Sequence, residues 1–268
     1  MQLGNLTWTK VADHVHKVVV VPIGSFEQHG HHLPLLTDTM IGAEIARRAE
    51  AELGDSAMFL PTLWIGASDH HLGFAGTVSL SMEVYTKALI DLVESLIGAG
   101  FRKIFLLNSH AGNIVPAGTA LYEVNLRYHE EMPDLWLTFA SWFDLAREQV
   151  AGLDGMTQQN VLHACEWETS VILRAHGDLV QRKTVKTART PFKSDFYSPD
   201  QSGRSRVSVT KTIQQMTPTG ALGRPDLASE DKGERILQAA VTEVVAFVRE
   251  FDRWEPTKPR PVNTKPSF

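Results

Sequence analysis

The chain has 268 residues, of which 43% are hydrophobic and 21% charged, and its formal net charge is −5. That length permits one large α/β domain, and the composition is that of a soluble globular protein. The acidic balance and the lack of long Lys or Arg runs exclude neither enzymes nor binding proteins, but they argue against nucleic acid and anionic membranes as partners.

The single cysteine, Cys165, excludes an intrachain disulfide and suits a reducing compartment. The opening MQLGNLTWTK lacks the charged and apolar regions of a secretory signal. No apolar run reaches the roughly 18 to 20 residues that a membrane span needs. We therefore expect a cytoplasmic protein.

Strand-like and helix-like patterns alternate along the chain. The β-branched run KVVVVPI at 17–23 predicts a buried strand, and apolar residues repeated every four positions predict a helix over 39–53. Further strands are predicted at 57–62, 103–108 and 135–140, and further helices at 83–98, after an Asn113 cap, at 164–176 and at 229–251. The stretch 177–224 reads as irregular with some strand.

This alternation predicts an α/β fold with a mainly parallel central sheet and helices on both faces. Neither an internal repeat nor a linker divides the chain, so we expect one domain over 1–253. The Pro- and Lys-containing end, 254–268, is predicted to be a loose arm or a docking segment.

Polar residues of the kinds that bind metals or catalyse reactions follow three of the predicted strands. They occupy positions 27–38, 68–77 and 110–113. Ligands of open parallel sheets bind at the carboxyl ends of the strands. The sequence therefore predicts a functional site at this edge of the sheet.

The first cluster is GSFEQHGHHLPLLTDT at 24–39. Glu27 and His29 are two apart, so in an extended stretch both side chains can point to one side, and Asp38 would return there after the Pro34 turn. Such carboxylates and imidazoles are ligands that Zn²⁺, Mn²⁺ or Fe²⁺ accept. A solvated polar loop is the alternative interpretation.

Two further motifs carry candidate ligands. In NSHAGN, His110 would point into the cleft from the end of a rigid strand, unless it only caps the next helix. In HACEWETS, His163 and Glu166 are three apart on a predicted helix and hence neighbours on one face. Glu166 could close a metal site and leave His163 for proton transfer; the alternative is a carboxylate at a helix start.

Together these motifs resemble the creatininase family from about Val18 to Ala228. The segments GASDHHLGFAGT at 66–77 and TGALGRP at 219–225 extend the resemblance. It implies a three-layer α/β/α sandwich, often in a hexamer, with two divalent ions, Zn²⁺ and/or Mn²⁺ with Fe²⁺ possible. The residue roles that it implies are Glu27 and His110 on one metal, His29 and Glu166 on the other, Asp38 as bridge, His163 as proton-transferring catalytic residue, and Ser68 and His71 on the substrate-binding loop.

One departure points to a relative rather than to creatininase itself. Creatininase has Tyr-Glu directly after the metal-binding histidine, and that Glu is a ligand, whereas this chain has Ala111 and Gly112. Relatives with a His-Gly-Gly-Asn turn take the ligand from a His-x-x-Glu-x-Glu-Thr-Ser segment, where Glu166 matches.

The leading functional prediction is hydrolysis of a C–N bond in a small cyclic amide by a metal-bound hydroxide. A deformylase or a hydrolase that opens a carbocyclic ketone would use the same site. A Cys-dependent amidase, with Cys165 beside His163, is a different mechanism, but helix geometry would place these two residues about 200° apart. A non-catalytic metal-binding protein is the remaining alternative.

Overall fold

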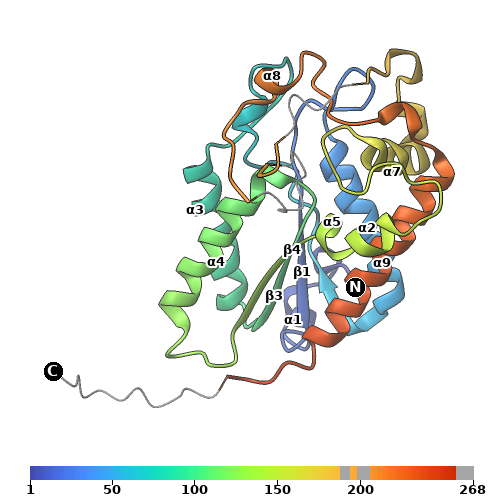
Figure 1. The fold of residues 1–268 in the computed structure, drawn as a ribbon. Coiled ribbons are helices and arrows are strands. Elements are labelled where there is room, and N and C mark those ends of the chain that lie inside the picture. The colour runs from blue at the N-terminus through green and yellow to red at the C-terminus, as the bar shows by residue number, and fades with distance from the viewer. Residues whose placement is uncertain (188–193, 198–205, 258–268) are drawn as a thin grey trace.

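The structure, a computed structural model, describes residues 1–187, 194–197 and 206–257. In those ranges four strands form one sheet in the order β2-β1-β3-β4, and every pairing is parallel. The strands are β1 (Val18–Ile23), β2 (Ala57–Phe59), β3 (Lys103–Asn108) and β4 (Trp136–Ser141). The mainly parallel sheet expected from the alternating pattern is confirmed (Figure 1).

Helices cover both faces of this sheet. The longer ones are α2 (Thr37–Leu53), α3 (Met82–Gly98), α4 (Ile114–Tyr128), α7 (Glu166–His176) and α9 (Glu230–Phe251). The short ones are α1 (Trp8–Val11), α5 (Trp142–Leu145), α6 (Arg147–Ala151) and α8 (Ile213–Met216). Single 3-10 turns are η1 (Leu3–Asn5), η2 (Gly54–Ser56), η3 (Asp69–His71), η4 (Ala111–Asn113), η5 (Gly177–Leu179), η6 (Arg182–Thr184) and η7 (Pro225–Leu227). None of these helices, within the described ranges, is long and apolar enough to cross a membrane.

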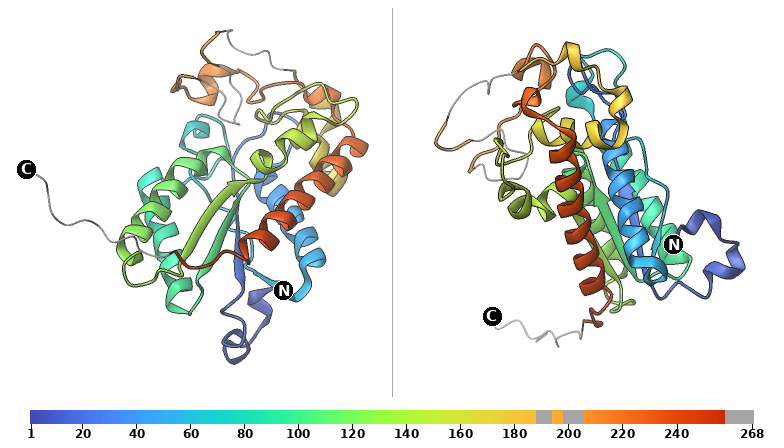
Figure 2. Two further views of the ribbon diagram at one scale, coloured as in Figure 1. Left: turned by 60° about the horizontal axis from the view of Figure 1, so that its bottom comes forward. Right: turned by 90° about the vertical axis from the view of Figure 1, so that its right-hand side faces the viewer.

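The three layers follow from the period-2 geometry of β1. Val18 and Val20 lie in one hydrophobic cluster with α2, α7 and α9, whereas Val19 and Val21 lie in a second cluster with α3 and α4. Successive side chains of a strand point to opposite faces, so a run of valines can fill both cores at once. Figures 1 and 2 show the resulting α/β/α sandwich, with α2 beside α9 on one side of the sheet.

The remaining differences from the predicted elements are local. The strand expected at 57–62 ends at Phe59, and the helix expected at 164–176 begins only at Glu166. The strand expected somewhere in 177–224 is absent from the described part of that stretch, which contains short helical turns instead. Residues 188–193 and 198–205 of it lie outside the described ranges.

The start of the predicted loose arm is packed against the domain. The Trp254 ring contacts those of Trp136 and Phe251, and the Thr257 amide donates to the carbonyl of Pro133 at 3.0 Å. Residues 258–268, the rest of the predicted arm, lie outside the described ranges.

Candidate metal centre

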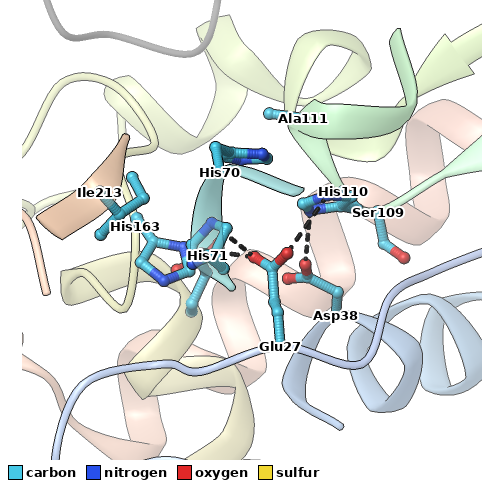
Figure 3. Close-up of a pocket in the computed structure, with 10 residues that line it drawn as sticks. Glu27, Asp38, His70, His71, Ser109, His110, Ala111, His163 and Ile213 are labelled. Carbon is cyan, nitrogen blue, oxygen red and sulfur yellow. Dashed lines mark ion pairs between the residues drawn. The ribbon is translucent and has the colours of Figure 1, made fainter. Parts of the chain in front are cut away.

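The predicted edge of the sheet does gather the candidate side chains. Glu27 and His29 lie in the loop after β1, Asp38 in the first turn of α2, and His110 directly after β3. All four are buried. Figure 3 shows the Glu27 carboxylate between the rings of His71 and His110, with Asp38 beside it.

Asp38 lies at the centre of the cluster. Its Oδ1 is 3.1 Å from His29 Nε2, its Oδ2 is 3.0 Å from His110 Nδ1, and the Ser25 hydroxyl donates to Oδ2 at 2.8 Å. Burial opposes ionisation, but the two histidines hold the pKa of Asp38 well below its usual range. Asp38 is therefore an anion with both oxygens directed at imidazole nitrogens.

The outer nitrogens of His29 and His110 bond to backbone carbonyls. His29 Nδ1 donates to the Glu27 carbonyl and His110 Nε2 to the Ala67 carbonyl, each at 3.1 Å. A carbonyl oxygen can only accept, so these bonds fix which nitrogen faces Asp38. Metal-binding histidines have this arrangement, with the outer N–H held by a carbonyl and the inner nitrogen left for the ion.

Glu27 is a buried carboxylate that faces imidazole rings and, among the described residues, no Lys, Arg or backbone amide donor. It is 0% exposed, and its oxygens lie 3.2 Å from His71 Nε2 and 3.3 Å from His110 Nε2. Burial raises its pKa to about 7. Buried polar groups in native proteins are nearly always satisfied, and a buried charge without a partner costs several kcal/mol. A cation at this position would remove that penalty.

The two glutamates at the start of α7 have opposite surroundings, and these surroundings disagree with the sequence-based prediction of Glu166 as a ligand. Glu166 Oε1 is 2.5 Å from Lys232 Nζ, and its Oε2 accepts from the backbone amides of Thr157 and Gln158 at 3.1 and 2.8 Å. Its charge is already neutralised, away from the cluster. Glu168 lies with His29 and Asp38, and burial raises its pKa to about 8. The structure thus brings Glu168, not the predicted Glu166, to the other candidate ligands.

Two triads of candidate ligand atoms share Asp38. They are Glu27–Asp38–His110 and His29–Asp38–Glu168, and within each triad the atoms lie within 4.8 Å of one another. Two other groups also meet that criterion, Glu27 with His70 and His71, and Glu27 with His29 and His163. Carboxylate oxygens and imidazole nitrogens suit Zn²⁺, Mn²⁺ or Fe²⁺, so the residues present fit a pair of divalent ions.

Residue 112 cannot supply the missing ligand. A Cβ on Gly112 would lie 2.2 Å from the Ala67 carbonyl oxygen and 2.3 Å from His110 Nε2. Any side chain there would displace the carbonyl that orients His110. The turn after β3 therefore supplies no candidate ligand besides His110, and Glu168 joins His29 and Asp38 from α7.

His163 precedes α7 rather than lying on it. The helix begins at Glu166 with Cys165 as its N-cap, and Ala164 adopts a left-handed φ of 50° that turns the chain sharply. The predicted helical neighbourhood of His163 and Glu166 is therefore wrong. His163 nevertheless reaches the cluster, with Nδ1 3.7 Å from Glu27 Oε1, and burial lowers its pKa well below the usual value.

Ser68 and His71, expected on a substrate-facing loop, lie against the cluster itself. Ser68 Oγ is 3.4 Å from His110 Nε2, and His71 Nε2 is 3.2 Å from Glu27 Oε1. Burial lowers the pKa of His71 far below its usual value, so the ring is neutral. The rings of His71 and His163 are in contact, with centroids 4.5 Å apart and planes tilted by 53°.

The cavity beside these rings is small. It offers about 20 Å³ and is lined by Glu27, Asp38, His70, His71, Ser109, His110, Ala111, His163, Glu168 and Ile213. That volume holds about one water. Ile213 begins α8, which packs against η3, and both segments contribute lining residues, Ile213 from α8 and His70 and His71 from η3 (Figure 3).

Cys165 does not fit the role of nucleophile. Its side chain is fully buried in the apolar cluster around α7, and its Sγ accepts from the Leu162 amide at 3.5 Å. Burial raises the pKa of the thiol well above its usual value. Reactive cysteines have lowered pKa values, so this sulfur is structural.

Sequence reasoning overlooked several residues of the centre. Glu168 stood in the same HACEWETS segment, but nothing local marks Glu166 as the partner of Lys232, 66 positions away. Asn113, predicted as a helix cap, makes no cap hydrogen bond; its amide donates to the Gly24 carbonyl and accepts from the Ala67 amide. His70 stands beside His71 in the sequence, and its ring stacks on His110 at 5.7 Å.

Known proteins resemble this chain over most of its length. The family model described as creatinine amidohydrolase matches residues 4–248. A mycofactocin precursor peptide peptidase of Mycobacterium tuberculosis is 31% identical over 247 residues, 89% of this chain and 86% of the relative. The creatinine amidohydrolase of Pseudomonas putida is 27% identical over 263 residues, 92% and 96% of the two chains. A solved manganese creatininase superposes with a TM-score of 0.79 at 24% identity, over 94% of this chain and 98% of that one. The chain belongs to the creatininase family of hydrolases.

Proposed function

We propose that the protein is a metal-dependent hydrolase that cleaves an amide C–N bond. One ion would be held by Glu27, Asp38 and His110, and the other by His29, Asp38 and Glu168. The observation that carries the proposal is that two triads of buried ligand atoms share one carboxylate. An aspartate with its two oxygens directed at different histidines is suited to bridge two ions.

The residues around the ions would accept and donate the protons of the reaction. A metal pair in such a site supplies an activated water and polarises the attacked carbonyl. His163 presents Nδ1 to the cavity, where it can accept the proton that the attacking water loses. The same nitrogen can then give that proton to the leaving nitrogen, so that an amide and a water become a carboxylic acid and an amine.

The substrate class that we favour is a small cyclic amide. The cavity has room for about one water, so α8 or η3 must move before any substrate enters. A formamide or a carbocyclic ketone would use the same polarised carbonyl, and both stay as alternatives. The M. tuberculosis relative makes a peptide amide the second candidate, because it is named as a peptidase and matches 89% of this chain.

Metal analysis and a substrate panel test the proposal. The purified protein should contain about two equivalents of Zn²⁺ or Mn²⁺, and a chelator should abolish turnover of one member of a panel of lactams, imides, formamides, cyclic ketones and short peptides. His163→Asn should keep both ions and lower kcat by roughly 10²–10⁴-fold. A protein that binds no divalent ion, or is fully active without one, would refute the proposal.

Two wider expectations accompany the small-molecule substrate. We expect a homo-oligomer, a hexamer by the family resemblance, and a cytoplasmic location. Light scattering on the purified chain tests the first of these, and fractionation of the producing cell tests the second.

A further inference from the structure

Gln28 lies between two proposed ligands, yet its side chain is directed away from them toward two other histidines. Its Nε2 is 2.8 Å from His71 Nδ1, 3.0 Å from His163 Nε2 and 3.0 Å from the Gly220 carbonyl oxygen. The Gln28 side chain is buried, as are both rings. We propose that Gln28 is a positioning residue, which sets the tautomers of His71 and His163 and so decides which ring donates and which accepts in the reaction. This inference rests on the proposed function only for its consequence in catalysis.

The orientation of the Gln28 amide is fixed from two sides. Its Oε1 accepts from the Gly30 amide at 2.9 Å, and its Nε2 donates to the Gly220 carbonyl. A flipped amide would set two donors against each other at Gly30 and two acceptors at Gly220. Gly220 belongs to the glycine-rich TGALGRP stretch and has φ +77°, and a Cβ there would lie 1.9 Å from Gln28 Oε1. The glycine-rich stretch therefore holds the Gln28 amide in one orientation.

The tautomer of His163 follows from the backbone of Gln28. His163 Nε2 is 2.8 Å from the Gln28 carbonyl oxygen, which can only accept. Nε2 therefore carries the hydrogen, and the lone pair is on Nδ1, 3.7 Å from Glu27 Oε1 at the cavity. His163 faces the cavity as a proton acceptor.

The tautomer of His71 follows from the side chain of Gln28. An NH₂ group has two hydrogens. One goes to the Gly220 carbonyl, and the other has only His71 Nδ1 left to meet, because His163 Nε2 already bears a hydrogen. His71 Nδ1 is thus an acceptor and its hydrogen is on Nε2, 3.2 Å from the Glu27 carboxylate. A lone pair there would face an oxygen lone pair instead.

The two neighbouring rings therefore present opposite groups to one cavity. His71 offers an N–H that can bind a substrate oxygen, and His163 offers a lone pair that can take a proton. Because His71 Nε2 carries a hydrogen, it has no lone pair to bind a metal. The group of Glu27, His70 and His71 is therefore not an ion site. The shared triads on Asp38 are unaffected.

The decisive substitution is Gln28→Glu, which keeps the shape and replaces the amide donor by an acceptor. We expect His71 to move its hydrogen to Nδ1, whereas His163 keeps its tautomer because its partner is a backbone carbonyl. Solid-state ¹⁵N NMR of the zinc-loaded full chain with ¹⁵N-labelled histidine distinguishes protonated from unprotonated ring nitrogens, whatever the assembly size. His71→Asn and His163→Asn spectra assign the signals.

The matched control is Gln158→Glu. That amide oxygen accepts from the backbone amides of Glu166 and Arg224, and its hydrogen bonds in the described chain involve no histidine. Both histidine tautomers should stay as in the wild type. If Gln28→Glu does not fold, Gln28→Met removes the donor without adding charge, and the His71 signals should then lose their single-tautomer pattern.

Three results would overturn the inference. They are a wild-type His71 that is protonated on Nδ1, His71 signals that do not change in Gln28→Glu or Gln28→Met, and a His163 that changes along with His71. With the best substrate of the panel, Gln28→Glu should retain two zinc ions and lower kcat by roughly 10²-fold with KM changed far less. If no substrate is ever hydrolysed, the proposed function fails while the NMR result still decides the tautomers.

Discussion

The candidate ligands come from two regions that encode them very differently. In the segment 24–38, which runs from the loop after β1 into the first turn of α2, Glu27, His29 and Asp38 all face the cluster. At the start of α7, Glu166 and Glu168 are two positions apart, and only Glu168 faces the cluster. About 200° of helix separates them, so they cannot serve the same site. A motif in a segment that the fold encloses thus predicts ligands more directly than a motif on a helix whose sides have different surroundings.

The presence of a cation partner separates the two glutamates. Glu166 is paired with Lys232 and accepts backbone hydrogen bonds, so it needs no metal. Glu27 and Glu168 are buried with no Lys or Arg partner among the described residues, and burial raises the pKa of each, to about 7 and about 8. Carboxylates that are left uncompensated in the protein are the ones expected to bind an ion.

The largest effect is expected from the shared carboxylate. Asp38→Asn should lose both ions, because it belongs to both triads. Activity should fall by roughly 10³-fold or more, the several kcal/mol that metal ions supply to the transition state. Metal stoichiometry and kcat/KM check this, with the surface variant Asp134→Asn as control. Retention of both ions in Asp38→Asn would break the proposed bridging role.

A paired substitution sharpens the contrast at α7. Glu168→Gln should lower the occupancy of one ion, since a neutral amide is a weaker ligand than a carboxylate. Glu166→Gln should keep both ions and instead lower the free energy of unfolding by about 3 kcal/mol, because Lys232 loses its buried partner. Metal analysis and denaturant titration of both variants decide the matter. A metal loss confined to Glu166→Gln would restore the assignment made from the sequence.

The smallest effect is expected at Cys165, the N-cap residue of α7 directly before the two glutamates. Cys165→Ala should leave kcat and metal content unchanged, because the sulfur only packs in the core and caps α7. The lost packing should lower stability by on the order of 1 kcal/mol. Activity assays and thermal melts test this. Loss of turnover with both ions retained would bring back a thiol mechanism.

Periodicity in the sequence was enough to predict the architecture. The β-branched run that became β1 and the helical repeats of α2, α3 and α9 are local patterns, and each long element lies within a few residues of its expected place. The predictions of elements fail where the hydrophobic pattern is short or mixes helical and strand spacing. Asn113 occupies the N-cap of α4 as predicted, but its side chain makes no cap hydrogen bond, because its amide bonds to Gly24 and Ala67, residues far away in the chain.

Sequence by itself determined the fold class, and it predicted the edge of the sheet where the candidate ligands gather and the four candidates that follow strands β1 and β3. Those residues are fixed because strand ends in a parallel sheet must converge. Only the tertiary structure decided between Glu166 and Glu168, the burial of Cys165 and the hydrogen-bond partners of Gln28. Each of these depends on groups distant in the chain, such as Lys232 and Gly220, whose proximity no local pattern encodes.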